Sequence, residues 1–179
     1  TVTFSGEAFP GAKILVVDKD IRSEKIVSQD IVAIEEGKFS VSFVGILQSQ
    51  HSFALLVKDK ENRTTQTKFF NIDTLANDLT VKDILVPPTT GFTQGVVTRG
   101  RNAVVIGYAT PGNDVKIEIG EIKKEIKAAK DGSYRAEVDT GTFEFGRHSV
   151  RVKQGDPEEK RESDFSITKT LVVSHLTSP

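Results

Sequence analysis

The sequence predicts an all-β chain that folds as two tandem antiparallel β-sandwiches. Three observations support this prediction: the chain contains an internal repeat, its apolar residues alternate with polar ones, and Gly and Pro separate the alternating runs. Many short strands at regular spacing are typical of a sandwich. With 179 residues, the chain has room for two small domains.

The repeat consists of three landmarks that occur twice in the same order. They are Gly6–Gly11 with Gly107–Gly112, Gly37–Val41 with Gly132–Ala136, and His51–Phe53 with His148–Val150. Their displacements are 101, 95 and 97 positions, so the differences in length fall in loops. A nearly constant period of this kind indicates two copies of one structural unit.

Within each copy, apolar residues recur at every second position, which places one face of each strand in a core and the other in water. The core positions predicted in this way are Phe39, Val41, Phe43, Phe53, Leu55, Val57, Val115, Ile117, Ile119, Tyr134, Ala136 and Val138. Turns separate the runs, because Pro presets one backbone angle and Gly accepts a positive φ. We assign structural turn roles to Pro10, Gly11, Gly37, Pro111, Gly112 and Gly132.

One segment leaves the choice between helix and strand open. Residues Glu121–Lys130 are good helix formers, with Ile122 and Ile126 four positions apart. Their counterpart in the first copy, Lys25–Ile34, is rich in β-branched residues. We favour a strand in both copies.

The connector Ile84–Gly91 contains Pro87 and Pro88, which stiffen the backbone and remove hydrogen-bond donors. We therefore expect two domains, residues 1–88 and 89–179. Residues Phe92–Arg99 would give the second domain a leading strand that the first domain lacks. Either the chain begins after that strand or the first domain closes its sheet differently.

The composition argues against several classes of protein. The 24 Lys and Arg nearly balance the 25 Asp and Glu, for a net charge of -1, and this argues against nucleic acid as the main partner. No apolar run reaches about 18 residues, so no membrane span is predicted. Cys and Met are absent. We expect a segment or processed form of a longer protein, whose neighbouring domains are its first partners.

Several of these motifs resemble bacterial immunoglobulin-like repeats of secreted or cell-surface proteins. Gly-x-Ala-x-Pro-Gly before an alternating strand is similar to the opening of such repeats, and Asp131–Tyr134 resembles one of their hairpins. Gly146–Val152 resembles a late strand. Asp59–Arg63 resembles a second hairpin, although Glu61 stands where Gly is usual. The connector resembles linkers in multi-domain surface proteins of candidate-phylum bacteria.

This resemblance covers nearly the whole chain and rests on turn and core residues, so it specifies a fold rather than a chemistry. It implies two tandem immunoglobulin-like β-sandwiches in an extracellular or cell-surface protein of bacteria. It also implies roles as spacers, adhesion stalks or accessory modules of larger enzymes. It brings no catalytic residues.

The three histidines do not suggest catalysis, which needs a nucleophile, a base and an orienting carboxylate. His51 and His148 occupy the same place in the two copies, each before a Ser, and we assign both a structural role. His175 lies in the polar C-terminal tail. We expect the chain not to be an enzyme.

No metal motif is present, and no cofactor is predicted. Three scattered histidines without Cys give no zinc spacing. Calcium is the better candidate, because it prefers the oxygen ligands of clustered acidic side chains. Its weak candidates are Asp18, Asp20, Asp59, Glu61 and Asn62, followed by Asp156, Glu158 and Glu159. Solvated hairpin tips explain the same residues.

Candidate binding residues are equally few. The chain has no Trp, two Tyr and eleven Phe. Phe69 and Phe70 are adjacent, so one of them can face outward, and Tyr108 is expected on a turn. These three are weak candidates for an aromatic platform.

We expect a structural spacer and interaction segment, in which Pro87 and Pro88 limit bending. The alternatives are an adhesion module that binds carbohydrate or protein, and an accessory domain of a larger extracellular enzyme.

Overall fold

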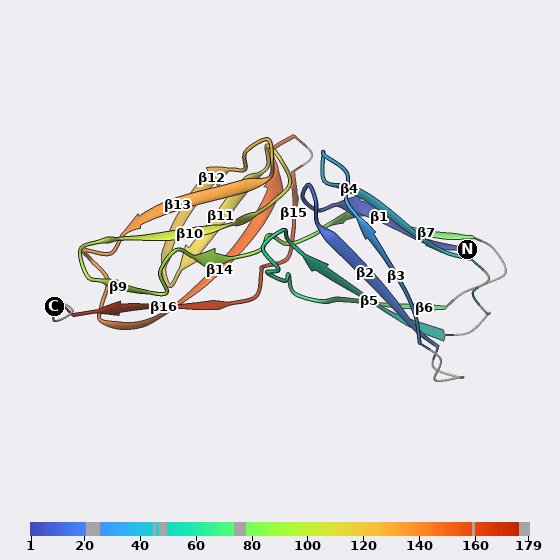
Figure 1. Cartoon of the computed structure of the whole chain (residues 1–179), viewed down its shortest axis with the longest axis horizontal. Helices are drawn as coiled ribbons and strands as arrows, with labels where there is room; N and C mark the ends of the chain where they lie inside the picture. Colours follow the sequence, from blue (N-terminus) through green and yellow to red (C-terminus); the bar gives the residue numbers. More distant parts are fainter. Residues whose placement is uncertain (21–25, 45, 47–49, 74–77, 159, 176–179) are drawn as a thin grey trace. The chain divides into compact units, whose positions relative to one another are not determined.

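The computed structural model describes residues 1–20, 26–44, 46, 50–73, 78–158 and 160–175. The chain divides into two compact units, Thr1–Val86 and Pro87–Pro179 (Figure 1). This boundary lies two residues before the division after Pro88 that we expected from the connector. Every regular element in the described residues is a β-strand. No helix in this part of the chain is long and apolar enough to cross a membrane.

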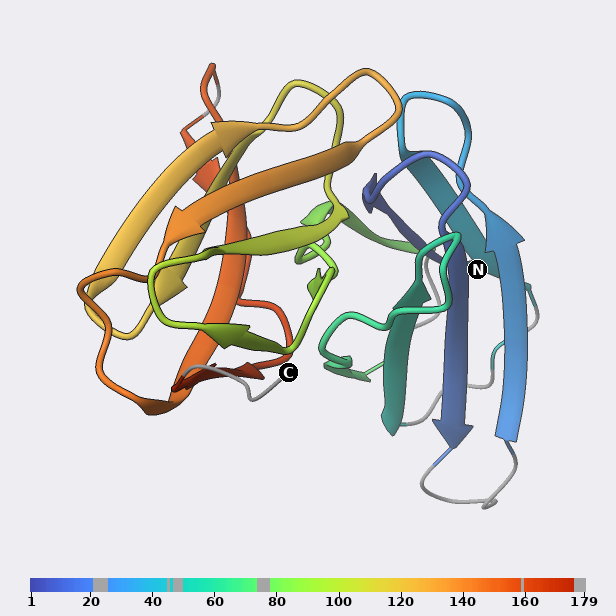
Figure 2. The same cartoon turned by 60° about the vertical axis from the view of Figure 1, so that its left-hand side comes forward.

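The first unit is built from two sheets. Three strands form one sheet in the order β4-β1-β7: β1 (Val2–Glu7), β4 (Lys38–Phe43) and β7 (Leu79–Leu85). Four strands form the other in the order β3-β2-β5-β6: β2 (Lys13–Asp20), β3 (Ile26–Val32), β5 (Gln50–Lys58) and β6 (Lys68–Asp73). Figure 2 shows β3, β2 and β5 side by side in blue and green. Neighbouring strands are antiparallel except β1 and β7, which are parallel.

In the core of the first unit, the buried rings of Phe4, Phe43 and Phe53 pack together with the half-buried ring of Phe70. The Phe4 ring lies 4.9 Å from Phe53, 5.5 Å from Phe70 and 6.5 Å from Phe43, measured between centroids. The predicted core positions of this unit are all buried. Full burial of one such side chain contributes about 1.5–3 kcal/mol, so the alternation on β4 and β5 holds the two sheets together.

The second unit also contains two sheets. One has the order β13-β10-β8: β8 (Gly91–Phe92), β10 (Asn102–Tyr108) and β13 (Ser133–Asp139). The other has the order β12-β11-β14-β16-β9: β9 (Val96–Thr98), β11 (Asp114–Ile119), β12 (Ile122–Lys127), β14 (Gly146–Asp156) and β16 (Lys169–Ser174). The short β15 (Arg161–Glu162) pairs with the end of β14. The predicted core positions of this unit are also buried.

Six strands have the same arrangement in both units. The pairs are β1 and β10, β2 and β11, β3 and β12, β4 and β13, β5 and β14, and β6 and β16. In the immunoglobulin nomenclature they are strands B, C, C′, E, F and G, divided into a B-E sheet and a C′-C-F-G sheet. The chain is therefore two tandem immunoglobulin-like β-sandwiches, as the sequence predicted.

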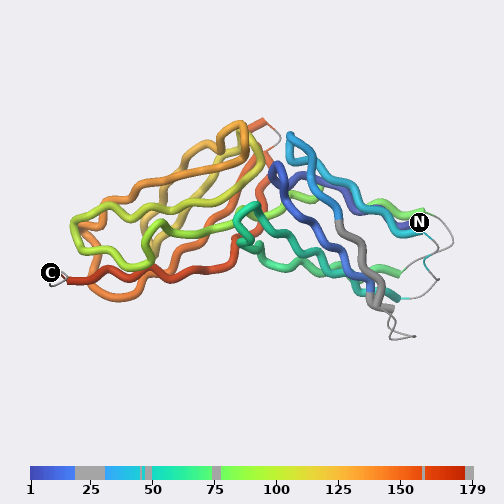
Figure 3. The backbone as a smooth tube through the Cα atoms, in the orientation of Figure 1, coloured from blue at the N-terminus to red at the C-terminus, as the bar shows by residue number. Residues whose placement is uncertain are grey.

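The units differ in the strand that flanks B. In the second unit this strand is β8, antiparallel to β10. In the first unit it is β7, the last strand, which runs parallel to β1 (Figure 3). The first unit thus closes its sheet differently, which was one of our two alternatives. The leading strand expected over Phe92–Arg99 is instead two short strands, β8 and β9, in different sheets.

The segment Glu121–Lys130, for which the sequence did not decide between helix and strand, contains strand β12, and its counterpart in the first unit contains β3. Ile126 packs against the core of the second unit while Ile122 is 40% exposed. Pairing with β11 over six residues outweighs the helix propensity of the lysines and glutamates.

Candidate functional site

The Pro-Gly motif of each copy forms the same turn. The amide of Ala12 donates to the carbonyl oxygen of Phe9 over 3.0 Å, and the amide of Asn113 donates to that of Thr110 over 3.1 Å. Gly11 and Gly112 follow the prolines with φ of 73° and 78°. Pro at the second position and Gly with positive φ at the third define a type II turn. Pro10 and Pro111 therefore each occupy the second position of a type II turn.

A second pair of turns supports the first. Gly37 and Gly132 have φ of 83° and 85°, and their amides donate to the carbonyl oxygens of Ile34 and Ala129 over 2.8 Å and 2.9 Å. Their own carbonyl oxygens accept from Ala8 over 2.7 Å and from Ala109 over 2.8 Å. The repeated sequence motifs thus form the same two hydrogen-bonded turns in both units, and we call this shared arrangement of turns and strands the shared frame.

Sequence reasoning did not assign a role to Gly6 or Gly107, which begin the repeated motif. A Cβ atom on Gly6 would lie 2.0 Å from the carbonyl oxygen of Ile84, and one on Gly107 would lie 2.1 Å from that of Thr89. The Tyr134 hydroxyl donates to the same Thr89 oxygen over 2.6 Å. Both glycines therefore let the flanking segment pack directly against strand B.

The first and last strands of the first unit form a parallel pair. Register matches Val2 with Leu79 at one end and Glu7 with Leu85 at the other. Two further backbone bonds extend the pair: Leu79 donates to Thr1 over 3.0 Å, and Val86 donates to Glu7 over 2.9 Å. A bulge with Asp83 at φ 59° interrupts the ladder. We call β1 and β7 the first terminal pair.

The second unit has an equivalent pair formed by other strands. Strand β9 runs parallel to β16, with Val96 opposite Val172 and Thr98 opposite Ser174. The amide of Val172 donates to Gly95 over 2.9 Å and that of Arg99 to Ser174 over 3.0 Å. We call β9 and β16 the second terminal pair. In both units, therefore, a strand near the N-terminus is bonded in parallel to the last strand.

The two repeated histidines occupy equivalent positions but make different contacts. His51 is buried, and its Nδ1 lies 2.7 Å from Oδ1 of the buried Asp18. His148 is half-buried, and its Nε2 lies 2.7 Å from the backbone oxygen of Glu144. The register explains the difference, because Ile119 stands in the second unit where Asp18 stands in the first. The imidazole of His175 stacks on Phe145 at 3.7 Å.

The calcium candidates are engaged in turns or lie apart. Asp59 is buried, and Oδ1 accepts the amides of Glu61 and Arg63 over 2.8 Å and 2.9 Å while Oδ2 accepts Arg63 Nε over 2.8 Å. Asn62 has φ 64°, so it completes this turn. Asp18 pairs with His51, and the side chain of Asp20 lies outside the described part.

In the hairpin after β14, an acidic side chain likewise accepts a backbone hydrogen bond within its own turn. Asp156 Oδ1 accepts the amide of Glu158 over 2.9 Å, and Glu159 lies outside the described residues. Among the described residues, no group of three His, Asp or Glu is placed to hold a metal ion.

The structure separates the three aromatic candidates. Phe69 is 67% exposed on β6. Phe70 faces the other way, is half-buried and packs on Phe4, so the two adjacent rings do not share one face. Tyr108 is the last residue of β10 rather than a turn residue, and its amide donates to Thr89 Oγ1 over 3.0 Å.

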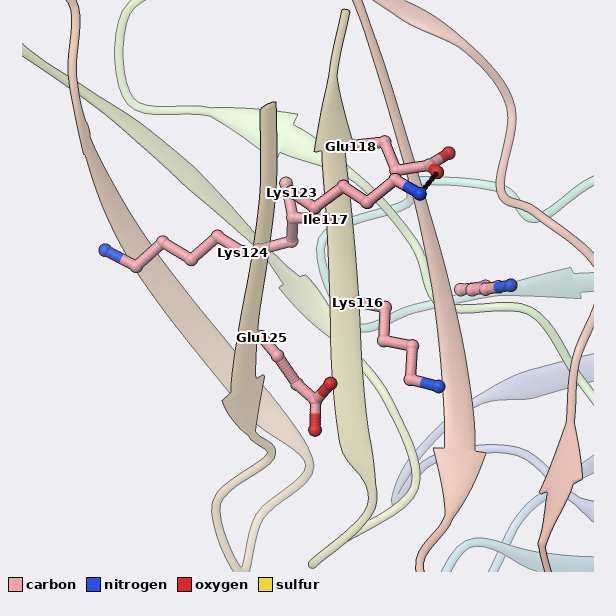
Figure 4. Close-up of a pocket in the computed structure, with 7 residues that line it drawn as sticks. Lys116, Ile117, Glu118, Lys123, Lys124 and Glu125 are labelled. Atoms are coloured by element: carbon pink, nitrogen blue, oxygen red, sulfur yellow. Dashed lines mark ion pairs between the residues drawn. The ribbon is translucent and has the colours of Figure 1, made fainter. Parts of the chain in front are cut away.

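The outer face of β11, β12 and β14 carries a network of ion pairs. Glu118 accepts Arg151 Nε over 2.8 Å and lies 3.8 Å from Lys123 Nζ, the pair marked in Figure 4. Glu162 binds Lys116 and, over 3.0 Å, Lys153. The hydrogen bonds from these two lysines lower the pKa of Glu162 to about 2. The hollow drawn in Figure 4 is a polar surface, because four charged residues of this network line it together with Ile117, Lys124 and Glu125.

Comparisons with known proteins support no closer assignment. No family model and no curated protein matches the chain. Among solved structures, a 1.5-MDa bacterial ice-binding adhesin is similar at 15% identity and a TM-score of 0.40, over 97% of this chain and 55% of that one. A DUF3823 family protein from Bacteroides ovatus is similar at 12% identity and a TM-score of 0.38, over 97% of this chain and 98% of that one. A tetra-tandem repeat from the extending region of a large adhesion protein is similar at 14% identity and a TM-score of 0.38, over 97% of this chain and 49% of that one.

This chain therefore spans about half the length of the two adhesion structures. Likenesses of this size define neither a family nor an activity. The fold class follows from the strand order of each unit.

Proposed function

We propose that this chain is a non-catalytic, load-bearing spacer segment of a longer bacterial surface or secreted protein. The observation that carries the proposal is the parallel pairing of terminal strands in each unit, β1 with β7 and β9 with β16. The sequence resemblance to bacterial surface repeats supports the location, and the tandem organisation supports the role of a spacer.

The direction of the strands determines how tension loads the bonds between them. In a parallel terminal pair, the chain enters at one end and leaves at the other. Pulling the chain ends apart therefore slides the two strands past each other and loads all their hydrogen bonds together. In an antiparallel terminal pair, the same pull would open the bonds one after another. Resistance to force depends on the rate of unfolding under load, and the parallel arrangement lowers this rate.

The first terminal pair is the longer of the two. It contains five register pairs and two flanking backbone bonds, whereas the second contains three register pairs and two flanking bonds. The side chains of Val2, Phe4 and Val97 anchor these strands in the cores. We infer that the second unit yields first under tension and that the first unit is the stronger link.

Single-molecule force spectroscopy tests the proposal by comparing two attachment geometries in the full chain. Pulling from the chain ends loads both terminal pairs in shear. Pulling through cysteines introduced by Thr1→Cys and Asp78→Cys loads the first pair by peeling, because these two positions lie at the same end of it. The chain has no native Cys to interfere. We expect both end-to-end events to occur at higher force than the peeling event. Equal forces in the two geometries would contradict a load-bearing role.

Recognition of a partner is a second candidate function, as an adhesion module that binds protein or glycan. The observation that favours it is the exposure of Phe69 on the outer face of β6.

A further inference from the structure

The outer faces of the two C′-C-F-G sheets have opposite chemistry at equivalent positions. In the second unit, register places Lys116 opposite Lys153 and Glu118 opposite Arg151. In the first unit, the same positions are occupied by Leu15 opposite Leu56 and Val17 opposite Ala54. The shared frame therefore accepts charged, ion-paired residues here. Folding alone does not require the first unit's face to be apolar.

The apolar residues of the first unit form two adjacent rows. One row is Leu15 and Leu56, and the next is Val17, Ala54 and Phe69. Leu56 is 37% exposed and Phe69 is 67% exposed, while the other three are half-buried. Contiguous exposed apolar side chains on a sheet are typical of an interaction surface.

A pair of lysines forms the next row of this face. Lys13 lies directly opposite Lys58 in the register of β2 and β5, and both side chains are exposed. Neither forms an ion pair with a residue in the described part of the chain. Like charges directly opposite each other destabilise a sheet, so the pair has no stabilising role within the fold. A partner that supplies carboxylates would remove this repulsion.

We propose that these three rows dock an acidic protein segment that carries apolar side chains beside its carboxylates. The segment's apolar residues cover Leu15, Leu56 and Phe69, and its carboxylates lie over Lys13 and Lys58. A second copy of this chain fits less well, because on β2, β5 and β6 these rows carry two lysines and no acid; the register of β3 adds Asp30 opposite Leu15.

The second unit provides the design for a matched variant. Val17→Glu with Ala54→Arg installs in the first unit the Glu118–Arg151 pair that the same frame already accepts in the second. Ser5→Glu with Ser40→Arg places the same pair on the other sheet of the first unit, where these two serines are opposite each other. A third variant, Lys13→Gln with Lys58→Gln, keeps the apolar rows and removes the charge.

A random 12-residue peptide library, displayed and selected on the full wild-type chain, is the probe. We expect the selected peptides to combine Asp or Glu with aromatic or aliphatic residues. Their affinity should fall about tenfold or more for the Val17→Glu/Ala54→Arg variant and stay unchanged for the Ser5→Glu/Ser40→Arg variant. Added salt and the Lys13→Gln/Lys58→Gln variant should both weaken binding.

Three results would overturn the proposal. One is selection of no peptide that distinguishes the wild type from the Val17→Glu/Ala54→Arg variant. Another is selection of peptides without acidic residues. The third is a concentration-dependent dimer in sedimentation that the same variant abolishes, since this would identify a second copy as the occupant.

Discussion

Gly6 lies so close to Ile84 that a Cβ atom at position 6 would be 2.0 Å from the Ile84 carbonyl oxygen. The contact joins β1 to β7 and lies within the first terminal pair. Gly107 makes the corresponding approach to Thr89 in the second unit. The glycine that begins the repeated motif therefore allows strand B to pack closely against its flanking segment, whereas the Pro-Gly pair of the same motif forms a turn.

Two glycines of the second unit should respond differently to the same change. Gly107→Ala forces a methyl group against backbone and should destabilise this unit by about 3 kcal/mol. Gly112→Ala meets no atom within 4 Å, so only the cost of its positive φ remains, about 1–2 kcal/mol. Both tyrosines of the chain, Tyr108 and Tyr134, lie in this unit, so tyrosine fluorescence during urea unfolding reports on it alone. A Gly112→Ala loss as large as that of Gly107→Ala would contradict the close approach.

The repeated histidines should have unequal effects on stability. His51→Ala leaves the buried Asp18 carboxylate without its imidazole partner and opens a cavity, so we expect a loss of about 2–4 kcal/mol in the first unit. His148→Ala affects a half-buried ring bound to a backbone oxygen, and we expect less than about 1 kcal/mol. Hydrogen–deuterium exchange resolves the two units. Equal losses would show that the shared sequence position, rather than Asp18, determines the role of the histidine.

The sequence was sufficient for the parts of the fold that depend on local patterns. Period-two alternation identified the buried residues of β4, β5, β11 and β13, and Pro10 and Pro111 identified the turns. Such signals can be read directly because a strand face and a type II turn each depend on residues close in the chain.

The features that define the candidate site depend on distant residues and could not be read in this way. Strand β7 has no alternating pattern, and its pairing with β1 links residues more than 75 positions apart. The adjacent Phe69 and Phe70 are equivalent by composition, and only the register with Ala54 and Phe53 decides which one is exposed. The difference between His51 and His148 likewise depends on Asp18 and Ile119 in a neighbouring strand.

The ion pairs of Glu162 should give the second unit a small dependence on pH. The pKa of Glu162 is about 2 in the folded chain, because Lys116 and Lys153 hydrogen-bond to the carboxylate, against an ordinary value of 4.5. A lowered pKa means that the stabilisation is complete above pH 4.5 and is lost as the pH falls toward 2. Since the groups are exposed, we expect only about 0.2–1 kcal/mol.

Urea unfolding of the wild type and of Glu162→Gln at pH 7 and pH 3, followed by tyrosine fluorescence, measures this contribution. The difference between the two proteins should shrink at pH 3 and also at high salt. A difference that stays constant across both conditions would show that Glu162 acts through packing instead of charge.

The load-bearing role of the first terminal pair is tested most directly by deleting one of its hydrogen bonds. Leu79→Pro removes the amide that donates to Thr1 over 3.0 Å, whereas Leu79→Gly removes the same side chain and keeps that amide. The measurement is the unfolding force of the full chain, pulled from its ends, in the two variants. We predict that Leu79→Pro lowers the force of one of the two unfolding events below its value in Leu79→Gly and leaves the other event unchanged. Equal forces in the two variants would contradict the account.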